Sequence, residues 1–121
     1  MLKLKNLVRK IENIEADIVI SQEGIVEVWN TLATGVFGWT EGEAIGTLLE
    51  TLVIPERYRE AHRKGLERFR LTASGLELCQ QLRVQGLHKE GYEIELEVSV
   101  LASAADGVTR FLGFIQQIPP T

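Results

Sequence analysis

Cysteine is almost absent from this sequence, which has only Cys79 among its 121 residues. A disulfide within the chain and a cysteine-based metal cluster are therefore both excluded. A surplus of positive charge is also lacking, since 13 Lys and Arg face 17 Asp and Glu and the formal net charge is −4. No overall field attracts nucleic acid, and we expect no nucleic-acid partner.

Long hydrophobic runs are missing too, and no signal-peptide pattern is present. We therefore expect no membrane partner and a reducing, cytoplasmic setting. The composition, 45% hydrophobic and 25% charged, is that of an ordinary soluble domain. The length fits one domain, and no output module such as a kinase is visible, so we expect a piece of a longer native chain.

A catalytic constellation is not found in the sequence. The serines lack an elbow or triad context, and the glycines form no phosphate-binding motif on a strand-to-helix turn. The two histidines, His62 and His88, fall in separate predicted elements and offer no metal spacing. We therefore expect a domain that is not an enzyme.

The first fifteen residues predict an amphipathic helix, because Leu4, Leu7, Ile11 and Ile14 recur at helical spacing. This stripe is too short for a self-sufficient coiled coil. It can cap the sheet of the domain, pair with a second copy, or do both. We predict a homodimer formed through this helix, followed by a domain over residues 16–118 and a tail over 119–121.

The rest of the chain predicts strands at both ends and helices between them. Residues 16–21 and 25–29 form a hairpin around Glu23-Gly24. Short helical pieces occupy residues 31–54, and the longest helix starts at Ile54-Pro55-Glu56 and runs to about Leu71. Three strands follow over residues 77–87, 92–102 and 108–118, with hairpin turns at 88–91 and 104–107. This order predicts an α+β domain with helices on one face of an antiparallel sheet.

Four blocks carry a resemblance to a known family. They read GIVEVWN (24–30), FGWTEGEAIG (37–46), IPERYREAHRKGLERF (54–69), and GLHKEGYEIELEVSV (86–100) followed by FLGFIQQI (111–118). In this order and spacing they resemble a PAS domain over roughly residues 14–118. The resemblance implies a five-stranded antiparallel sheet of strand order 2-1-5-4-3. It also implies a sensory and dimerising module of a bacterial-type signalling protein, which holds a small ligand or cofactor between sheet and helices, or holds none.

The last strand departs from the family pattern. Family members often end it with an Asp-Ile-Thr signature that links the sensor to its output, whereas this chain reads Gln117-Ile118-Pro119. Signal relay through that polar anchor is therefore not expected here.

His62 is the main candidate for a site. Its helical spacing places Tyr58, Gly65 and Phe69 on the same face. His62, Leu66, Arg68 and Phe69 resemble the helix that supplies the axial histidine of haem in oxygen-sensing PAS domains, with His62 then the metal ligand. The oxygen-sensing PAS domains also use a distal arginine in the strand after this helix, and the corresponding position here is Leu82. The competing interpretation is a histidine that packs in the core or pocket, as in many PAS domains without haem.

Cys79 and the tryptophans are weaker candidates. Light-sensing PAS relatives of the LOV class need a cysteine in the helix that follows the FGW block. Residues 46–52 of this chain hold no cysteine, so the resemblance excludes flavin photochemistry of the LOV type. Cys79 itself is expected to be a small buried hydrophobic residue of a strand. Trp39 can stack on a flavin or another planar ligand, although Trp29 and Trp39 are more typical of core anchors. The candidate binding residues are therefore His62, Tyr58, Phe69, Leu82 and Trp39; the cofactor is undetermined, with haem ranked before flavin.

The long helix also has a basic bias, which predicts a solvated face with ion pairs. An arginine reaching a carboxylate ligand or haem propionates is the second interpretation. The sequence thus predicts a sensory domain that binds a small ligand, with a haem gas sensor and a ligand-free protein-interaction module as alternatives.

Overall fold

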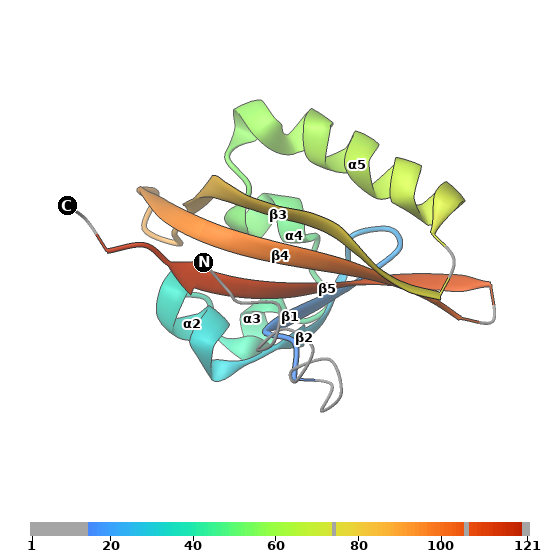
Figure 1. Cartoon of the computed structure of the whole chain (residues 1–121). Coiled ribbons are helices and arrows are strands. Elements are labelled where there is room, and N and C mark those ends of the chain that lie inside the picture. Colours follow the sequence, from blue (N-terminus) through green and yellow to red (C-terminus); the bar gives the residue numbers. More distant parts are fainter. Residues whose placement is uncertain (1–14, 74, 106, 120–121) are drawn as a thin grey trace.

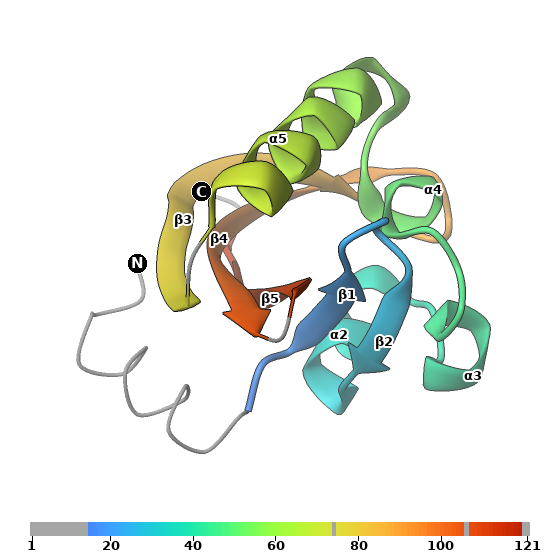
Figure 2. The ribbon, with the colours of Figure 1, turned by 90° about the vertical axis from the view of Figure 1, so that its right-hand side faces the viewer.

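The structure, a computed structural model, describes residues 15–73, 75–105 and 107–119. Its elements are β1 (Ile18–Ser21), β2 (Val26–Trp29), α2 (Thr31–Phe37), α3 (Glu41–Ala44), α4 (Leu49–Val53), the 3-10 turn η1 (Glu56–Tyr58), α5 (Arg59–Thr72), β3 (Gly75–Leu87), β4 (Glu93–Ala105) and β5 (Val108–Gln117). The strands form one sheet of order β2-β1-β5-β4-β3. Figure 1 shows α5 running along β3 and β4, and Figure 2 shows the sheet curving beneath α4 and α5.

All neighbouring strands are antiparallel. The α+β class and the predicted strand order are therefore confirmed. Two of the three C-terminal strands are longer than expected, since β3 begins at Gly75 and β4 continues to Ala105, whereas β5 ends at Gln117, one residue earlier than expected. The β3–β4 register shifts between Leu78 and Gln80, a bulge at Cys79. Beyond it, even-numbered residues of β3 pair with even-numbered residues of β4, which sets the face that meets the helices.

Side-chain caps mark the starts of helices α2 and α3. The Asn30 side chain accepts a hydrogen bond from the Ala33 amide at 3.0 Å and opens α2. Thr40 and Glu43 form a reciprocal capping box that opens α3. Gly38, at φ +84°, ends α2 in the left-handed region that glycine adopts without strain. Asn30, Gly38, Thr40 and Glu43, which belong to the two PAS-like blocks at 24–30 and 37–46, thus determine where α2 and α3 begin and where α2 ends.

The predicted long helix is divided in two, which is a correction. The Tyr58 amide donates to the Pro55 carbonyl at 2.9 Å, and residues 56–58 form a 3-10 turn. Tyr58, at φ −106° and ψ −3°, is then the N-cap of α5. The α-helical spacing assumed for Tyr58 and His62 does not apply across this change of pitch.

The main core lies between the sheet and the helices, around the buried side chains of Trp29, Phe37 and Leu96. The indole of Trp29 donates to the Trp39 carbonyl at 2.9 Å and to Thr34 Oγ1 at 3.1 Å. Trp29 therefore anchors the core with its polar atom satisfied, as predicted. A second cluster, with Leu101 and Phe114 at its centre, lies on the opposite face of the sheet.

A buried carboxylate joins three elements at the start of β1. Asp17 is 3% exposed. One of its oxygens accepts from Asn30 Nδ2 and the other from the Ile115 amide, each at 2.8 Å. The same aspartate therefore fixes β1 against the N-cap of α2 and against β5. The sequence reasoning did not identify this contact.

The predicted N-terminal helix lies outside the described residues. The domain boundaries at 15/16 and 118/119 stay predictions.

Candidate ligand cavity

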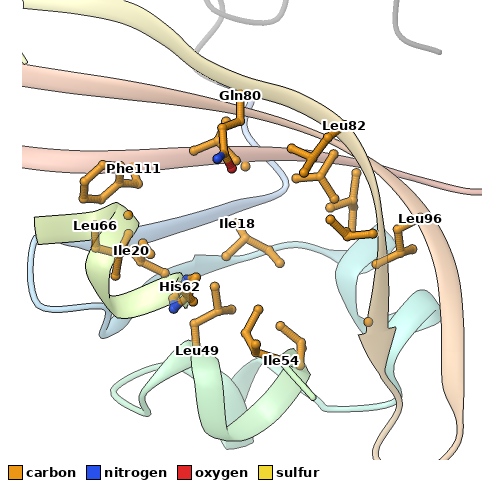
Figure 3. Close-up of a pocket in the computed structure, with 18 of the residues that line it drawn as sticks. Ile18, Ile20, Leu49, Ile54, His62, Leu66, Gln80, Leu82, Leu96 and Phe111 are labelled. Carbon is orange, nitrogen blue, oxygen red and sulfur yellow. The ribbon is translucent and has the colours of Figure 1, made fainter. Parts of the chain in front are cut away.

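A cavity of about 220 Å³ lies inside the main core, between the sheet and the helices α4 and α5. Four strands, β1, β3, β4 and β5, form its wall on the sheet side. In Figure 3, Gln80 and Leu82 of β3 approach from one side and Leu49 and Ile54 from the other, with His62 of α5 between them. Ala61, Gln80 and Leu82 are exposed members of the lining. The cavity therefore opens between α5 and β3.

The lining is almost entirely apolar. Its residues from β4 and β5 are Leu96, Val98, Val100, Phe111, Gly113 and Ile115. Among the described lining residues there is no Asp, Glu, Lys or Arg, and the polar side chains are those of His62, Gln80 and Gln85, with the Cys79 thiol beside them. Gln85 is engaged, since its Nε2 donates to Glu95 Oε1 at 2.9 Å.

His62 has a buried ring nitrogen with no partner. Its Nδ1 is buried and makes no hydrogen bond within the described part of the chain. Burial lowers the pKa of His62 from its usual value, Glu50 opposes this shift, and Arg63 adds to it. The imidazole is therefore neutral at pH 7. A buried polar atom without a partner is costly, so this atom calls for a ligand or water.

Three arginines of η1 and α5 make polar contacts with neighbouring groups. Arg63 Nε lies 3.0 Å from a Glu50 oxygen. Arg59 Nε donates to the Ile54 carbonyl at 2.9 Å. Arg57 forms a bidentate pair with Glu93 at 2.6 and 2.7 Å. The contacts of Arg57 and Arg63 are ion pairs, as the basic bias predicted, whereas Arg59 binds a backbone carbonyl.

The structure brings three of the five predicted binding residues to the cavity: His62, Phe69 and Leu82. Tyr58 does not line it. Its ring lies below the Arg57 guanidinium, 4.5 Å from the centroid, and its hydroxyl faces Gln85 Oε1 at 3.4 Å.

Trp39 does not line the cavity either. It packs on the outside of the core, and its indole donates to the Leu52 carbonyl at 3.2 Å. Its ring also lies 5.2 Å from the Lys89 ammonium. Trp39 therefore serves as a core anchor, which the sequence analysis considered more typical.

The remaining candidates, Cys79 and His88, lie at the β3 bulge and in the β3–β4 turn. Cys79 is half-buried at the β3 bulge and lines the cavity. His88 lies in the β3–β4 turn, as predicted, where its ring stacks on Tyr92 with centroids 4.4 Å apart. Two cavity glycines, Gly86 and Gly113, were missed by sequence reasoning. Every second residue of a strand points to the same face, so the alternation along β3 and β5 was the signal that could have identified both glycines.

No group of three or more His, Cys, Asp or Glu side chains is arranged for a metal ion within the described ranges. In the same part of the chain, no helix combines the length and the apolar character needed to cross a bilayer.

Haem does not fit this cavity as it stands. A cavity of roughly 150 Å³ holds one benzene molecule, and a porphyrin macrocycle is several times larger than benzene. Arg57, Arg59 and Arg63 contact Glu93, the Ile54 carbonyl and Glu50, so binding of propionates by these arginines would compete with the existing contacts. His62 has the chemistry of an axial ligand, and its buried Nδ1 has no partner.

Strand order β2-β1-β5-β4-β3, with the helices and an apolar cavity on one face, defines an α+β domain of the PAS type. The chain belongs to the PAS fold family, whose profile matches residues 7–118. PAS domains are sensory modules and in general are not enzymes.

A curated relative is the sensor protein FixL of Bradyrhizobium diazoefficiens, 31% identical over 104 residues, or 86% of this chain and 20% of that protein. An Azorhizobium caulinodans protein is 28% identical over 106 residues, 88% of this chain and 14% of that protein. The chain thus spans a fifth or less of the length of these relatives.

Solved structures share the fold. The PAS domain of an HTR-like protein from Haloarcula marismortui superposes with a TM-score of 0.67 at 19% identity, covering 94% of this chain and 96% of that one. The PAS domain of the Cronobacter turicensis quorum-sensing receptor RpfR, in complex with BDSF, gives 0.65 at 17% identity, covering 87% and 97%.

Proposed function

We propose that this PAS domain is the sensory part of a longer cytoplasmic signalling protein and that it binds a small molecule in the cavity beneath α4 and α5. The observation that carries the proposal is the apolar cavity of about 220 Å³ with the unpartnered Nδ1 of His62 in its wall. An apolar pocket with one or two polar groups is typical of small-molecule sites. The RpfR PAS domain in complex with BDSF supports a ligand in this fold.

The test uses benzene as a probe of the cavity. In ¹⁵N-labelled protein, benzene should shift the amide signals of Leu66, Val98 and Phe111, which line the cavity, and leave those of β2 unchanged. Mass spectrometry of the purified protein under native conditions searches for a molecule retained from the cell. If benzene shifts no lining residue and no molecule is retained, the ligand-binding function is refuted and the ligand-free interaction module is favoured.

A haem gas sensor is the competing function, because His62 has the required chemistry. Its test is the absorption spectrum of protein expressed with added haem. A Soret band that disappears in His62→Ala would establish haem and overturn our preference for a smaller ligand. We expect no such band, because the cavity is smaller than the macrocycle.

Relay of the signal through a dimer is the second part of the proposal. Its basis is the apolar stripe of Leu4, Leu7, Ile11 and Ile14 in the sequence. Replacement of Leu7 and Ile11 by Glu should give a monomer in light scattering. Leu32→Glu is the matched control, since Leu32 is an exposed leucine of α2. An unchanged dimer, or a monomer in the unsubstituted chain, contradicts this part.

A further inference from the structure

The polar chemistry of the cavity is concentrated at one atom. His62 Nδ1 is the side-chain nitrogen that is buried without a partner in the described ranges. The other polar groups of the lining differ from it. Gln85 is held by Glu95, and Gln80 is exposed at the opening. Besides the weakly polar Cys79 thiol, the imidazole of His62 is therefore the group of the inner lining with an unmet hydrogen bond.

The cavity offers no compensation for a charged ligand. No Lys, Arg, Asp or Glu is among its described lining residues. The two charges that act on the His62 imidazole, those of Glu50 and Arg63, form an ion pair at 3.0 Å. Because an ion buried without a counter-ion is strongly destabilised, a carboxylate or an ammonium is excluded from the interior.

Size limits the ligand further. The volume of about 220 Å³ exceeds the roughly 150 Å³ that holds one benzene molecule, and corresponds to space for about nine non-hydrogen atoms. The walls are mostly branched aliphatic side chains and the rings of Phe37, Phe69 and Phe111, which favour an apolar body.

We propose that the ligand is a small neutral molecule with an apolar body and a single hydroxyl or N–H group, which hydrogen-bonds to the imidazole of His62. This inference rests on the proposed ligand-binding function and specifies its chemical class. A hydroxyl is suited to either tautomer of the imidazole, since it both donates and accepts. The same hydrogen bond would fix the orientation of the ligand.

Two pairs of probes test the inference by calorimetric titration of the full chain. p-Cresol and toluene differ only in a hydroxyl, and p-cresol should bind about tenfold more tightly, the value of one good hydrogen bond. Benzyl alcohol and benzoate have similar shape but differ in charge, and benzoate should bind at least about a hundredfold more weakly.

His62→Phe removes the nitrogen and should abolish the preference for p-cresol over toluene. His62→Gln returns a polar group at this position and should restore part of the preference. The matched control is His88→Gln, because His88 lies in the β3–β4 turn and does not line the cavity. It should bind all four probes as the unsubstituted chain does. Circular dichroism confirms that each variant is folded.

The outcomes separate the two claims. Binding of toluene without a preference for p-cresol, or a preference that survives in His62→Phe, overturns the inference while ligand binding in the cavity stands. Benzoate bound as tightly as benzyl alcohol also overturns it. If none of the four probes binds, the cavity is not a ligand site, and the proposed function falls together with the inference.

Discussion

Filling the cavity from α5 should stabilise the domain and block its ligand. Gly65 lies in the middle of α5 and lines the cavity, and a Cβ added there meets no atom within 4 Å. Replacement by leucine therefore places a side chain into empty space. Gly35, in α2, is the matched control: a Cβ there also meets nothing within 4 Å, but the position is exposed and lies outside the cavity.

The magnitude has two parts. Removal of a glycine from a helix interior gains about 1 kcal/mol at either position. Only Gly65→Leu adds burial, and roughly half of the ~2 kcal/mol of a fully buried leucine is expected from a cavity that stays partly open. We expect a gain of about 2 kcal/mol for Gly65→Leu and about 1 kcal/mol for Gly35→Leu. For a chain of this length, each kcal/mol raises Tm by about 4 °C.

Urea denaturation and thermal melting measure these gains, and calorimetric titration with toluene measures binding. Gly65→Leu should lose toluene binding while Gly35→Leu retains it. If Gly65→Leu is less stable than Gly35→Leu, the space under α5 is not a cavity that a side chain can enter. If it is more stable but still binds toluene, the probe occupies another place.

Three further changes test other features. Asp17→Ala should cost about 3 kcal/mol in urea denaturation, because Ile115 N and Asn30 Nδ2 lose a buried acceptor; a cost below about 1 kcal/mol contradicts the role assigned to this carboxylate. Gly86→Ala should cost about 1–3 kcal/mol, since its Cβ would lie 2.7 Å from Leu96 Cδ1 and 2.9 Å from Phe37 Cε1. Gly42→Ala, where nothing lies within 4 Å, is the control, and equal stability of the two variants would show that Gly86 has room. The pKa of His62 is lowered in the folded state, so below about pH 6.5 the unfolded chain binds more protons there and the free energy of unfolding falls as pH falls. His62→Phe should lack this part of the pH dependence and keep the Glu50–Arg63 ion pair, and identical pH profiles for the two proteins would refute the shift.

The sheet was predictable from the sequence because its signals are local. Alternation of Glu93, Glu95 and Glu97 with Ile94, Leu96 and Val98 marks one strand and its inner face. The turn glycines mark the hairpins, and Gly91 and Gly107 both adopt positive φ. The strand order came from the family resemblance instead, since pairing between distant strands leaves no local pattern.

The candidate site was only partly predictable, for a similar reason. Helical spacing correctly associated His62 with Phe69, which lie in one continuous helix. It failed for Tyr58, because the 3-10 turn that ends there changes the pitch. The missed wall residues Gly113 and Phe111 come from β5, far along the chain, and the three-dimensional pairing of β5 with β1 brings them beneath α5.

The loose attachment of α5 has a kinetic consequence. None of its fourteen residues is buried, and Leu71 near its end is 73% exposed. Segments with few buried contacts open locally at a small free-energy cost, far below that of global unfolding. The backbone amides of α5 should therefore exchange with deuterium much faster than those of β4 and β5. A molecule that bridges α5 to the sheet would slow this exchange. The exchange rate of the α5 amides therefore reports whether the cavity is filled.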